Sequence, residues 1–238
     1  MAEPRSKTQT ADLSVAWRDV VRFIRQLSHD LRNHLNPIEL QSAYISELER
    51  EDDVKGEIKR LREMISGLTS TLQSLSKTVS EVKPSLITYR ASDVAEDLRK
   101  KVARDFSSES AKITWNIHAG DAMLDVDPQL LEESLTELLA NAFRYSQSGG
   151  HVVVTAKVEN ERLLVTIEEP KKQFELSADN FGREPLRNVS QGHYGLGLNR
   201  VRAIVEAHGG KMYAQYNPNA SILTTTVVLP VSGDSAQD

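Results

Sequence analysis

Cysteine is absent from the 238-residue chain. Its absence excludes a disulfide framework, a thiolate nucleophile and a cysteine-ligated metal, and it fits a reducing compartment. The sequence also lacks an apolar run of roughly 18 residues that could span a membrane, and residues 1–13 lack the apolar core of a signal peptide. Lys and Arg are scattered and the formal net charge is −5. We therefore expect a cytoplasmic protein whose partners include neither nucleic acid nor an anionic membrane.

Proline and glycine are rare between residues 14 and 81, where they occur only at Pro37, Gly56 and Gly67. Apolar residues there recur at alternating steps of three and four, which is the heptad pattern of a coiled coil or a helix bundle. The second part of the pattern comprises Val54, Ile58, Leu61, Ile65, Leu68, Leu72, Leu75 and Val79. The first part comprises Trp17, Val20, Ile24, Leu27, Leu31, Ile38, Ile45 and Leu48, with His34 and Gln41 as polar members. The charged residues 49–53 separate the two parts, so we predict a hairpin of two long helices.

Two apolar seams of this length are too long for a pair of helices to bury on their own. We therefore predict that the hairpin pairs with a second copy of the chain to form a four-helix bundle, which makes the protein a homodimer. The alternative is that the hairpin packs against the C-terminal half of its own chain.

The periodicity of the sequence changes after residue 83. Short segments rich in Val, Ile, Thr and Tyr predict strands at 85–90, 112–118, 151–158, 162–169, 211–216 and 222–229. Amphipathic stretches between them predict helices at 92–106, 128–146 and 196–208. This half is expected to be an α/β sandwich with a mixed sheet and with helices mainly on one face.

The predicted fold class is therefore α+β, with a long helical hairpin followed by an α/β sandwich. The hairpin domain is expected over residues 14–83 and the sandwich over residues 84–231. Residues 1–13 and 232–238 are expected to be disordered ends.

Two histidines stand five residues apart in the stretch SHDLRNHL. His34 falls on the heptad line, which favours a structural role as a partly buried histidine hydrogen-bonded within the bundle. His29 is two residues from both Leu27 and Leu31 and therefore lies off the seam. An exposed imidazole beside Asp30 is a functional arrangement, because the carboxylate accepts a proton from one ring nitrogen and makes the other more nucleophilic. A surface histidine without a function is the alternative.

The stretch FIRQLSHDLRNHL resembles the H-box of two-component sensor histidine kinases, in which an acid follows a phosphoacceptor histidine and Asn or Thr stands four residues on. The resemblance implies that His29 receives a phosphoryl group and that Asp30 is its general base. It also implies that Asn33 positions water for dephosphorylating a partner response regulator. The family usually has Pro where this chain has His34. Pro37 frees the carbonyl of Asn33 three residues later and moves any kink along the helix.

The stretch DPQLLEESLTELLANAFRYS, residues 127–146, is similar to the N-box helix of the Bergerat-type ATPase fold, which histidine kinases share with gyrase, Hsp90 chaperones and mismatch-repair ATPases. Glu137 and Asn141 stand one turn apart, where a carboxylate and a carboxamide can hold Mg²⁺ and the phosphate oxygens it bridges. The resemblance assigns Arg144 to the phosphates and Tyr145 to the place of the usual aromatic. Most histidine kinases have Asn in place of Glu137, whereas gyrase-like relatives have a Glu that activates water. A solvated helix face is the alternative.

The stretch GHYGLGL, residues 192–198, opens a predicted helix that continues into VRAIVEAHGG. Glycines let the backbone approach a ligand closely, and the amides at a helix N-terminus favour phosphate. The run resembles the G2 box of the same family, which implies ATP contacts at Gly195, Leu196, Gly197 and Leu198. Arg187 is a candidate γ-phosphate contact through its resemblance to the family's F-box arginine.

The adenine-binding motif departs from the family pattern, which is Asp-x-Gly-x-Gly with the Asp on the adenine amino group. In LLVTIEEPKKQ, Glu169 replaces that Asp and Lys171 replaces the first Gly. Glu can still accept the hydrogen bond, but its extra methylene shifts the carboxylate, and the Lys side chain is expected to crowd the base. Loss of one charged hydrogen bond would cost about 1.5–3 kcal/mol, or roughly ten- to a hundredfold in affinity.

The resemblance covers residues 20–230 and implies a dimeric histidine kinase core that uses ATP and Mg²⁺. It would phosphorylate itself on His29 and pass the phosphoryl group to an aspartate in the receiver domain of a separate response regulator. A separate sensor protein would supply the input. One alternative is a histidine phosphotransferase or regulator-binding phosphatase whose ATP domain has degenerated at Glu169 and Lys171. A gyrase-like ATPase that uses Glu137 is a third class, and the phosphoacceptor hairpin disfavours it.

Overall fold

The computed structural model describes residues 17–48, 52–145, 150–174, 181–183 and 195–232. The chain divides into two compact units, the helical unit (residues 1–80) and the α/β unit (residues 81–238). The boundary expected from the sequence was between residues 83 and 84. Within the described ranges, no helix combines the length and the apolar character needed to cross a membrane.

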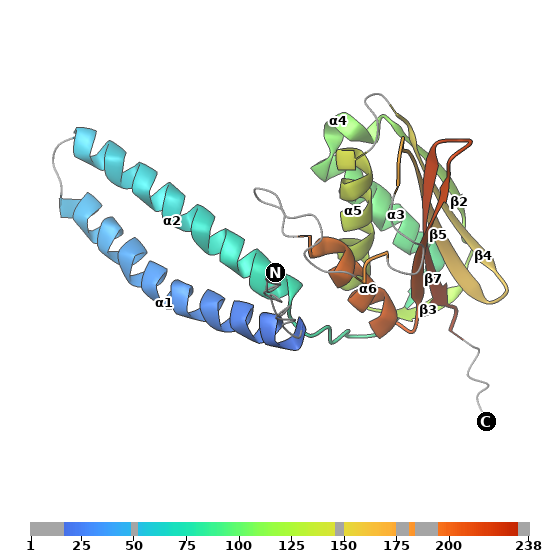
Figure 1. Ribbon diagram of the computed structural model, residues 1–238, viewed down its shortest axis with the longest axis horizontal. Coiled ribbons are helices and arrows are strands. Elements are labelled where there is room, and N and C mark those ends of the chain that lie inside the picture. Colours follow the sequence, from blue (N-terminus) through green and yellow to red (C-terminus); the bar gives the residue numbers. More distant parts are fainter. Residues whose placement is uncertain (1–16, 49–51, 146–149, 175–180, 184–194, 233–238) are drawn as a thin grey trace, which may run out of the picture. The chain divides into compact units, whose positions relative to one another are not determined.

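The helical unit is a hairpin of two helices, α1 (Trp17–Leu48) and α2 (Asp52–Thr78), which lie side by side (Figure 1). Helix α1 contains Pro37 and continues past it. Helix α2 begins within the charged run that was predicted to form the connection. The long-armed hairpin expected from the heptad pattern is confirmed.

The two helices bury only part of the predicted apolar seams against each other. On the α2 side, Ile65, Leu72 and Val79 are 5–8% exposed, and they are spaced by seven residues. On the α1 side, the fully buried side chains are the small polar ones of Ser28 and Ser42. The seam residues that stay more than a third exposed are Leu27, Leu31, Ile38 and Ile45 of α1 and Val54, Leu61 and Leu68 of α2. A single hairpin therefore leaves much of both seams uncovered.

The α/β unit is built on a five-stranded sheet in the order β2, β4, β5, β7, β6. These strands are β2 (Ile113–His118), β4 (Val152–Glu159), β5 (Arg162–Pro170), β7 (Ile222–Pro230) and β6 (Lys211–Asn217). β2 and β4 pair parallel and the other neighbours pair antiparallel. The mixed sheet predicted from the sequence is therefore present. A separate antiparallel pair is formed by β1 (Ile87–Arg90) and β3 (Met123–Val126).

The helices of the α/β unit are α3 (Ala91–Asp105), α4 (Ser107–Ser110), α5 (Pro128–Tyr145) and α6 (Gly197–Ala207). Two of the three four-residue elements, α4 and β3, were not predicted from the sequence, because four residues carry little periodicity. The turn between β4 and β5 has Asn160 and Glu161 at φ 50° and 56°. Two consecutive left-handed residues give the hairpin turn that matches the twist of the paired strands.

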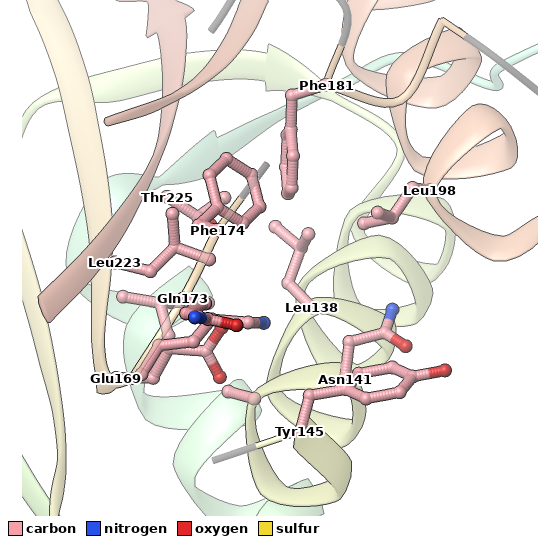
Figure 2. Close-up of a pocket in the computed structure, with 13 residues that line it drawn as sticks. Leu138, Asn141, Tyr145, Glu169, Gln173, Phe174, Phe181, Leu198, Leu223 and Thr225 are labelled. Atoms are coloured by element: carbon pink, nitrogen blue, oxygen red, sulfur yellow. The ribbon is translucent and has the colours of Figure 1, made fainter. Parts of the chain in front are cut away.

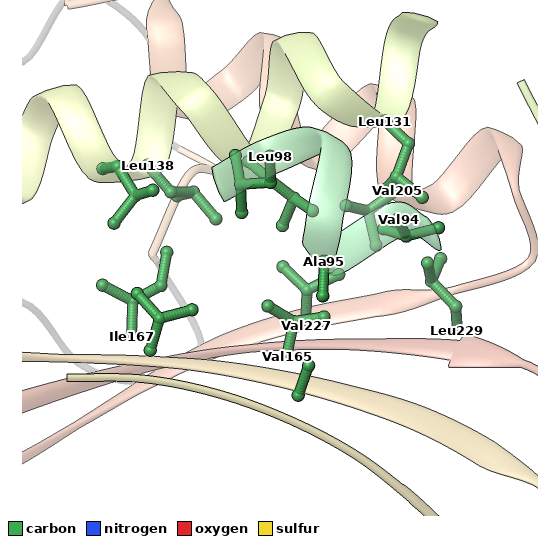
Figure 3. Packing of buried hydrophobic residues seen from close by; sticks show 14 of the residues in the cluster. Val94, Ala95, Leu98, Leu131, Leu138, Val165, Ile167, Val205, Val227 and Leu229 are labelled. Atoms are coloured by element: carbon green, nitrogen blue, oxygen red, sulfur yellow. The ribbon is translucent and has the colours of Figure 1, made fainter. Parts of the chain in front are cut away.

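The core of the α/β unit lies between the helices and one face of the sheet (Figure 3). Leu98 of α3, Leu131 and Leu138 of α5 and Val205 of α6 are at most 4% exposed. They face side chains of β5 and β7, of which Val165, Ile167, Val227 and Leu229 are labelled in Figure 3. The layered sandwich with helices mainly on one face is confirmed.

Asp127 fixes the first turn of α5. Its Oδ1 accepts hydrogen bonds from the backbone N–H groups of Gln129 and Leu130, both at 3.1 Å, which is an N-cap geometry. Its Oδ2 accepts the backbone N–H of Ser85 at 2.9 Å. Burial raises the pKa of Asp127, but these three backbone hydrogen bonds outweigh it, so the pKa lies below the ordinary value.

His208 joins the end of α6 to the same cap. Its Nε2 accepts the backbone N–H of Asp127 at 2.9 Å. Because a backbone N–H can only donate, the ring proton is on Nδ1, which lies 2.7 Å from the carbonyl of Ile204 and donates to it. The buried histidine therefore uses both ring nitrogens to hold α6 beside the start of α5.

Candidate active site

His29 stands on the exposed surface of α1. Its side chain is 65% exposed and that of Asp30 is 52% exposed. His29 Nδ1 lies 3.2 Å from Asp30 Oδ1 and 3.3 Å from Nδ2 of Asn33, one turn later. Both contacts are on Nδ1, so neither engages Nε2. A ring held at one nitrogen by a carboxylate presents the other nitrogen as a nucleophile.

Gln26 belongs to this cluster and was not predicted from the sequence. Its Nε2 donates a hydrogen bond to Asp30 Oδ1 at 2.9 Å from one turn earlier in α1. This hydrogen bond and that from His29 lower the pKa of the Asp30 carboxyl below its ordinary value. Asp30 is therefore ionised at neutral pH. The available signal was the i, i+4 spacing of a carboxamide and a carboxylate, which is common on helix surfaces.

His34 was predicted to be partly buried within the dimeric bundle. In the single hairpin its side chain is exposed, and its burial in a dimer stays a prediction. Its seam neighbours Leu31 and Ile38 are 39% and 46% exposed. The physical reason is that α1 turns a neighbouring stripe, which includes Ser28 and Ser42, towards α2. On α1, the middle of the heptad line, from Leu27 to Ile45, is therefore not the surface that faces α2.

A chain of polar side chains runs along α5 towards its C-terminal end. Asn141 Nδ2 donates to Glu137 Oε1 at 3.1 Å, and Arg144 Nη1 donates to Asn141 Oδ1 at 3.1 Å. The first residue of α6, Gly197, lies against this row. A Cβ atom at Gly197 would be 2.2 Å from Glu137 Oε1, so any larger residue there would force the Glu137 side chain to move.

A cavity of about 370 Å³ opens between α5, β5, β7 and the start of α6. Most of its wall is apolar, formed by Leu138, Ala142, Ile167, Phe174, Phe181, Leu198 and Leu223. Its polar groups come from Asn141, Tyr145, Glu169, Lys171, Gln173 and Thr225. Figure 2 shows Asn141 and Tyr145 on α5 across the cavity from Glu169, with Phe174 and Phe181 at its upper end. The volume and the sparse polar groups are typical of a small-molecule site.

Glu169 and Lys171 form an ion pair in the wall of this cavity. Lys171 Nζ donates to Glu169 Oε1 at 3.1 Å, and the two side chains are 21% and 8% exposed. The other carboxylate oxygen, Oε2, is buried and has no hydrogen-bond partner in the described structure. Burial raises the pKa of Glu169 above its ordinary value, and the Lys171 ammonium only partly opposes this rise.

Arg202 of α6 anchors the short described segment at residues 181–183, and it too was not predicted from the sequence. Its Nε donates to the carbonyl of Phe181 at 3.1 Å, and its Nη2 donates to that of Met212 at 3.0 Å. Gly182 has φ 74°, and a Cβ there would lie 2.8 Å from the carbonyl oxygen of Leu198. Phe181 is thereby held in the cavity wall.

The structure brings four of the nine predicted nucleotide contacts together around the cavity. Asn141, Tyr145, Glu169 and Leu198 line the cavity. Glu137 joins them through its hydrogen bond to Asn141.

The remaining predicted contacts stand beside the cavity or outside the described chain. Arg144 reaches the row through Asn141. Gly195 has φ 63°, a conformation suited to glycine. Leu196 is the N-cap residue of α6, and its side chain makes no capping hydrogen bond. Arg187 lies outside the described residues.

Comparison with known proteins places this site in a family. The family described as histidine kinase-, DNA gyrase B- and HSP90-like ATPases matches residues 126–233. The chain is 30% identical to the sensor histidine kinase WalK of Bacillus subtilis over 131 residues, which is 52% of this chain and 21% of WalK. It is 26% identical to the sensor histidine kinase CpxA of Escherichia coli over 212 residues, which is 83% of this chain and 44% of CpxA. The chain thus spans less than half the length of these two relatives.

Solved structures share the fold over most of the chain. Full-length ShkA, solved in complex with AMPPNP, superposes with a TM-score of 0.67 at 18% identity over 90% of this chain and 47% of ShkA. The histidine kinase AdeS of Acinetobacter baumannii superposes with a TM-score of 0.52 at 20% identity over 86% of this chain and 98% of the AdeS chain. Residues 126–233 therefore match the histidine kinase-, DNA gyrase B- and HSP90-like ATPase family, and the chain as a whole is similar to sensor histidine kinases.

Proposed function

We propose that this protein is the catalytic core of a two-component histidine kinase, which phosphorylates itself on His29 and transfers the phosphoryl group to an aspartate of a separate response regulator. The observation that carries the proposal is the exposed His29 ring, held at Nδ1 by an ionised Asp30, in a chain that also has an ATPase-family domain. A phosphoacceptor needs this exposure, because a second protein must reach it to remove the phosphoryl group.

The chemistry at His29 follows from the two ring nitrogens. Nε2 would form a bond to the γ-phosphorus of ATP while the bond from that phosphorus to the bridging oxygen breaks, with ADP as the leaving group. The attack leaves positive charge on the ring, and the Asp30 carboxylate beside Nδ1 stabilises it by hydrogen bonding and charge. The hydrogen bond from Gln26 lowers the pKa of that carboxyl further.

The cavity of the α/β unit fits ATP as the phosphoryl donor. Its volume of about 370 Å³ is in the range of small-molecule sites. The unpartnered Oε2 of Glu169 is an acceptor that suits an amino group of a base. The uncapped start of α6 at Leu196 suits a phosphate. None of these observations favours the alternative of a degenerate, non-binding ATP domain.

Magnesium would be held at Glu137 and Asn141, whose carboxylate and amide oxygens are the hard ligands that this ion prefers. In the described parts of the chain, no three His, Asp or Glu side chains gather as a metal site. The ion would therefore share its coordination with phosphate oxygens and water, and when bound it would neutralise charge on the phosphates. Arg144 would add a further positive charge beside Asn141.

Two exposed apolar surfaces of the helical unit support a homodimer and a regulator partner. The open seams are those that a second hairpin would cover in a four-helix bundle. A separate stripe runs along α1 from His29 through Asn33 and Pro37 to Leu40 and Tyr44, at steps of three and four. Leu40 and Tyr44 are 75% and 61% exposed. A receiver domain that reaches His29 would cover them.

The test is incubation of the full chain with γ-labelled ATP and Mg²⁺, alongside His29→Gln and the matched variant His34→Gln. We expect acid-labile label on the native protein and on His34→Gln and none on His29→Gln. Label that survives in His29→Gln would overturn the assignment. No label on the native protein, together with acceptance of phosphoryl from a phosphorylated regulator, would instead support a phosphotransfer protein.

A further inference from the structure

The ion pair in the cavity wall involves only one of the two carboxylate oxygens of Glu169. Glu169 is 6% exposed, and its Oε1 accepts from Lys171 Nζ at 3.1 Å. Oε2 has no partner among the described residues. An unpaired buried carboxylate oxygen is costly, because desolvation is not offset by a hydrogen bond. The cavity therefore presents one acceptor that a ligand with a single N–H group at that point would satisfy.

Lys171 is fixed beside this acceptor. Its Nζ lies 5.4 Å from the centroid of the Tyr145 ring and 5.7 Å from that of Phe174, and the side chain is 21% exposed. Both rings belong to residues that line the cavity. An ammonium group has three N–H donors, and Glu169 takes one of them. The cavity wall thus offers an acceptor next to a cationic donor.

We propose that Glu169 and Lys171 act together as a base-reading pair, in which Oε2 accepts from the amino group of adenine and Lys171 Nζ donates to the adjacent ring nitrogen N1. The inference rests on the proposed binding of ATP and goes beyond it, because it gives Lys171 a role in recognition. The Lys side chain was expected to crowd the base. In the structure it pairs with Glu169 in the wall of a cavity of about 370 Å³.

The pair selects adenine over guanine because the two bases have opposite hydrogen-bonding groups at these positions. Adenine has a donor, the 6-amino group, next to an acceptor, N1. Guanine has an acceptor, O6, next to a donor, N1–H. In the same pose O6 would face the Oε2 acceptor of Glu169 and N1–H would face the ammonium of Lys171, so neither hydrogen bond could form. We therefore expect GTP to bind more weakly than ATP.

The test is calorimetric titration of the full chain with Mg²⁺ and three nucleotides: ATP, 1-deaza-ATP and 7-deaza-ATP. In 1-deaza-ATP a C–H replaces N1, whereas 7-deaza-ATP keeps the edge that the pair reads. We expect 1-deaza-ATP to bind at least about tenfold more weakly than ATP, and 7-deaza-ATP to bind within about twofold. Equal binding of ATP and 1-deaza-ATP would overturn the inference and leave the proposed function intact. Absence of binding by any nucleotide would overturn both.

A variant then assigns the effect to Lys171. In Lys171→Met the preference for ATP over 1-deaza-ATP should shrink to within about twofold, because the donor to N1 is gone. The matched control is Lys172→Met, whose side chain is exposed and outside the cavity lining, and it should keep the native preference. A full preference retained in Lys171→Met would overturn the role of this residue. The native titrations decide the inference even if Lys171→Met does not fold.

Discussion

The two units of this protein bury their apolar residues to different degrees. In the α/β unit the leucines at the centre of the core, among them Leu135, Leu139 and Leu163, are 0% exposed. In the helical unit Leu61 and Leu68 of the predicted seam are 43% and 55% exposed. A closed core stabilises a unit by itself, whereas an open one depends on what covers it. The proposed nucleotide site therefore lies in a unit with a closed core, and the proposed phosphoacceptor does not.

The largest expected effect contrasts a core leucine with a seam leucine. Leu135→Ala should lower the free energy of unfolding of the α/β unit by about 2–5 kcal/mol at every protein concentration, because it opens a cavity in a closed core. Leu31→Ala should destabilise the helical unit by an amount that depends on protein concentration, because a second copy covers that residue in the proposed dimer. Urea unfolding measures both effects when it is monitored by hydrogen exchange in peptides from β4 and α1. An effect of Leu31→Ala that is independent of concentration would contradict the dimer.

The second prediction breaks the close contact between α5 and α6. In Gly197→Ala the new Cβ would displace Glu137 Oε1, 2.2 Å away, and with it the hydrogen bond from Asn141. We expect Mg²⁺–ATP to bind about tenfold more weakly by calorimetry. The matched variant in the helical unit is Gly56→Ala, where nothing lies within 4 Å, and it should bind as the native protein does. Unchanged affinity in Gly197→Ala would show that Glu137 takes no part in binding.

The third prediction removes the cap of α5. Asp127→Ala loses the side-chain acceptors of Gln129, Leu130 and Ser85, and it should cost about 1 kcal/mol in the free energy of unfolding of the α/β unit. Asp127→Asn keeps one oxygen acceptor and should lose less. Denaturant unfolding at neutral pH compares the two variants, and equal losses would show that the cap is not the cause.

The fourth prediction is a substitution that stabilises the helical unit. Gly67 lies inside α2, and a Cβ there would meet nothing within 4 Å. Gly67→Ala should therefore stabilise the helical unit by about 0.5–1 kcal/mol through its higher helix propensity. Hydrogen exchange of α2 peptides should slow. Faster exchange would mean that a partner surface needs the space at Gly67.

The smallest effect is confined to alkaline pH. The hydrogen bond to Asp97, followed by burial, raises the pKa of Tyr89 from 10.0 to about 12. Because the pKa is higher in the folded state, the stabilisation is present below pH 10 and is lost as the pH rises towards 12. The unfolding midpoint of the native protein should therefore fall more steeply than that of Tyr89→Phe over this interval. Parallel curves would contradict the shift.

The sequence predicted the helices and strands whose apolar residues recur at a regular spacing. The heptads indicated α1 and α2, and alternation or continuous apolar runs indicated the five strands of the main sheet. The seam also suggested that His34 is partly buried in a dimeric bundle, whereas its side chain is exposed in the single hairpin. Heptad spacing fixes which residues share a stripe, but it does not say which stripe faces the other arm of the hairpin.

The site residues that were missed act through contacts between distant positions or through common surface pairs. Arg202 lies 21 residues from Phe181 in the sequence and donates to the backbone carbonyl of Phe181. Because every residue has such a carbonyl, the sequence does not indicate this pair. Gln26 has a local partner in Asp30, but such pairs are frequent on helices. The departures at Glu169 and Lys171 were visible in the sequence. Their pairing and the free Oε2 needed the three-dimensional arrangement.

Pro37 has a mechanical consequence for the proposed phosphoacceptor helix. Because proline has no N–H group, the carbonyl of Asn33 has no i+4 backbone donor within α1. Bending the helix at that turn therefore sacrifices one hydrogen bond fewer than bending it elsewhere, a difference of about 1 kcal/mol. Helix α1 is therefore expected to bend most easily at the turn that begins at Asn33, whose side-chain amide contacts the His29 ring. Flexing there would change how the imidazole is presented without unwinding the rest of the helix.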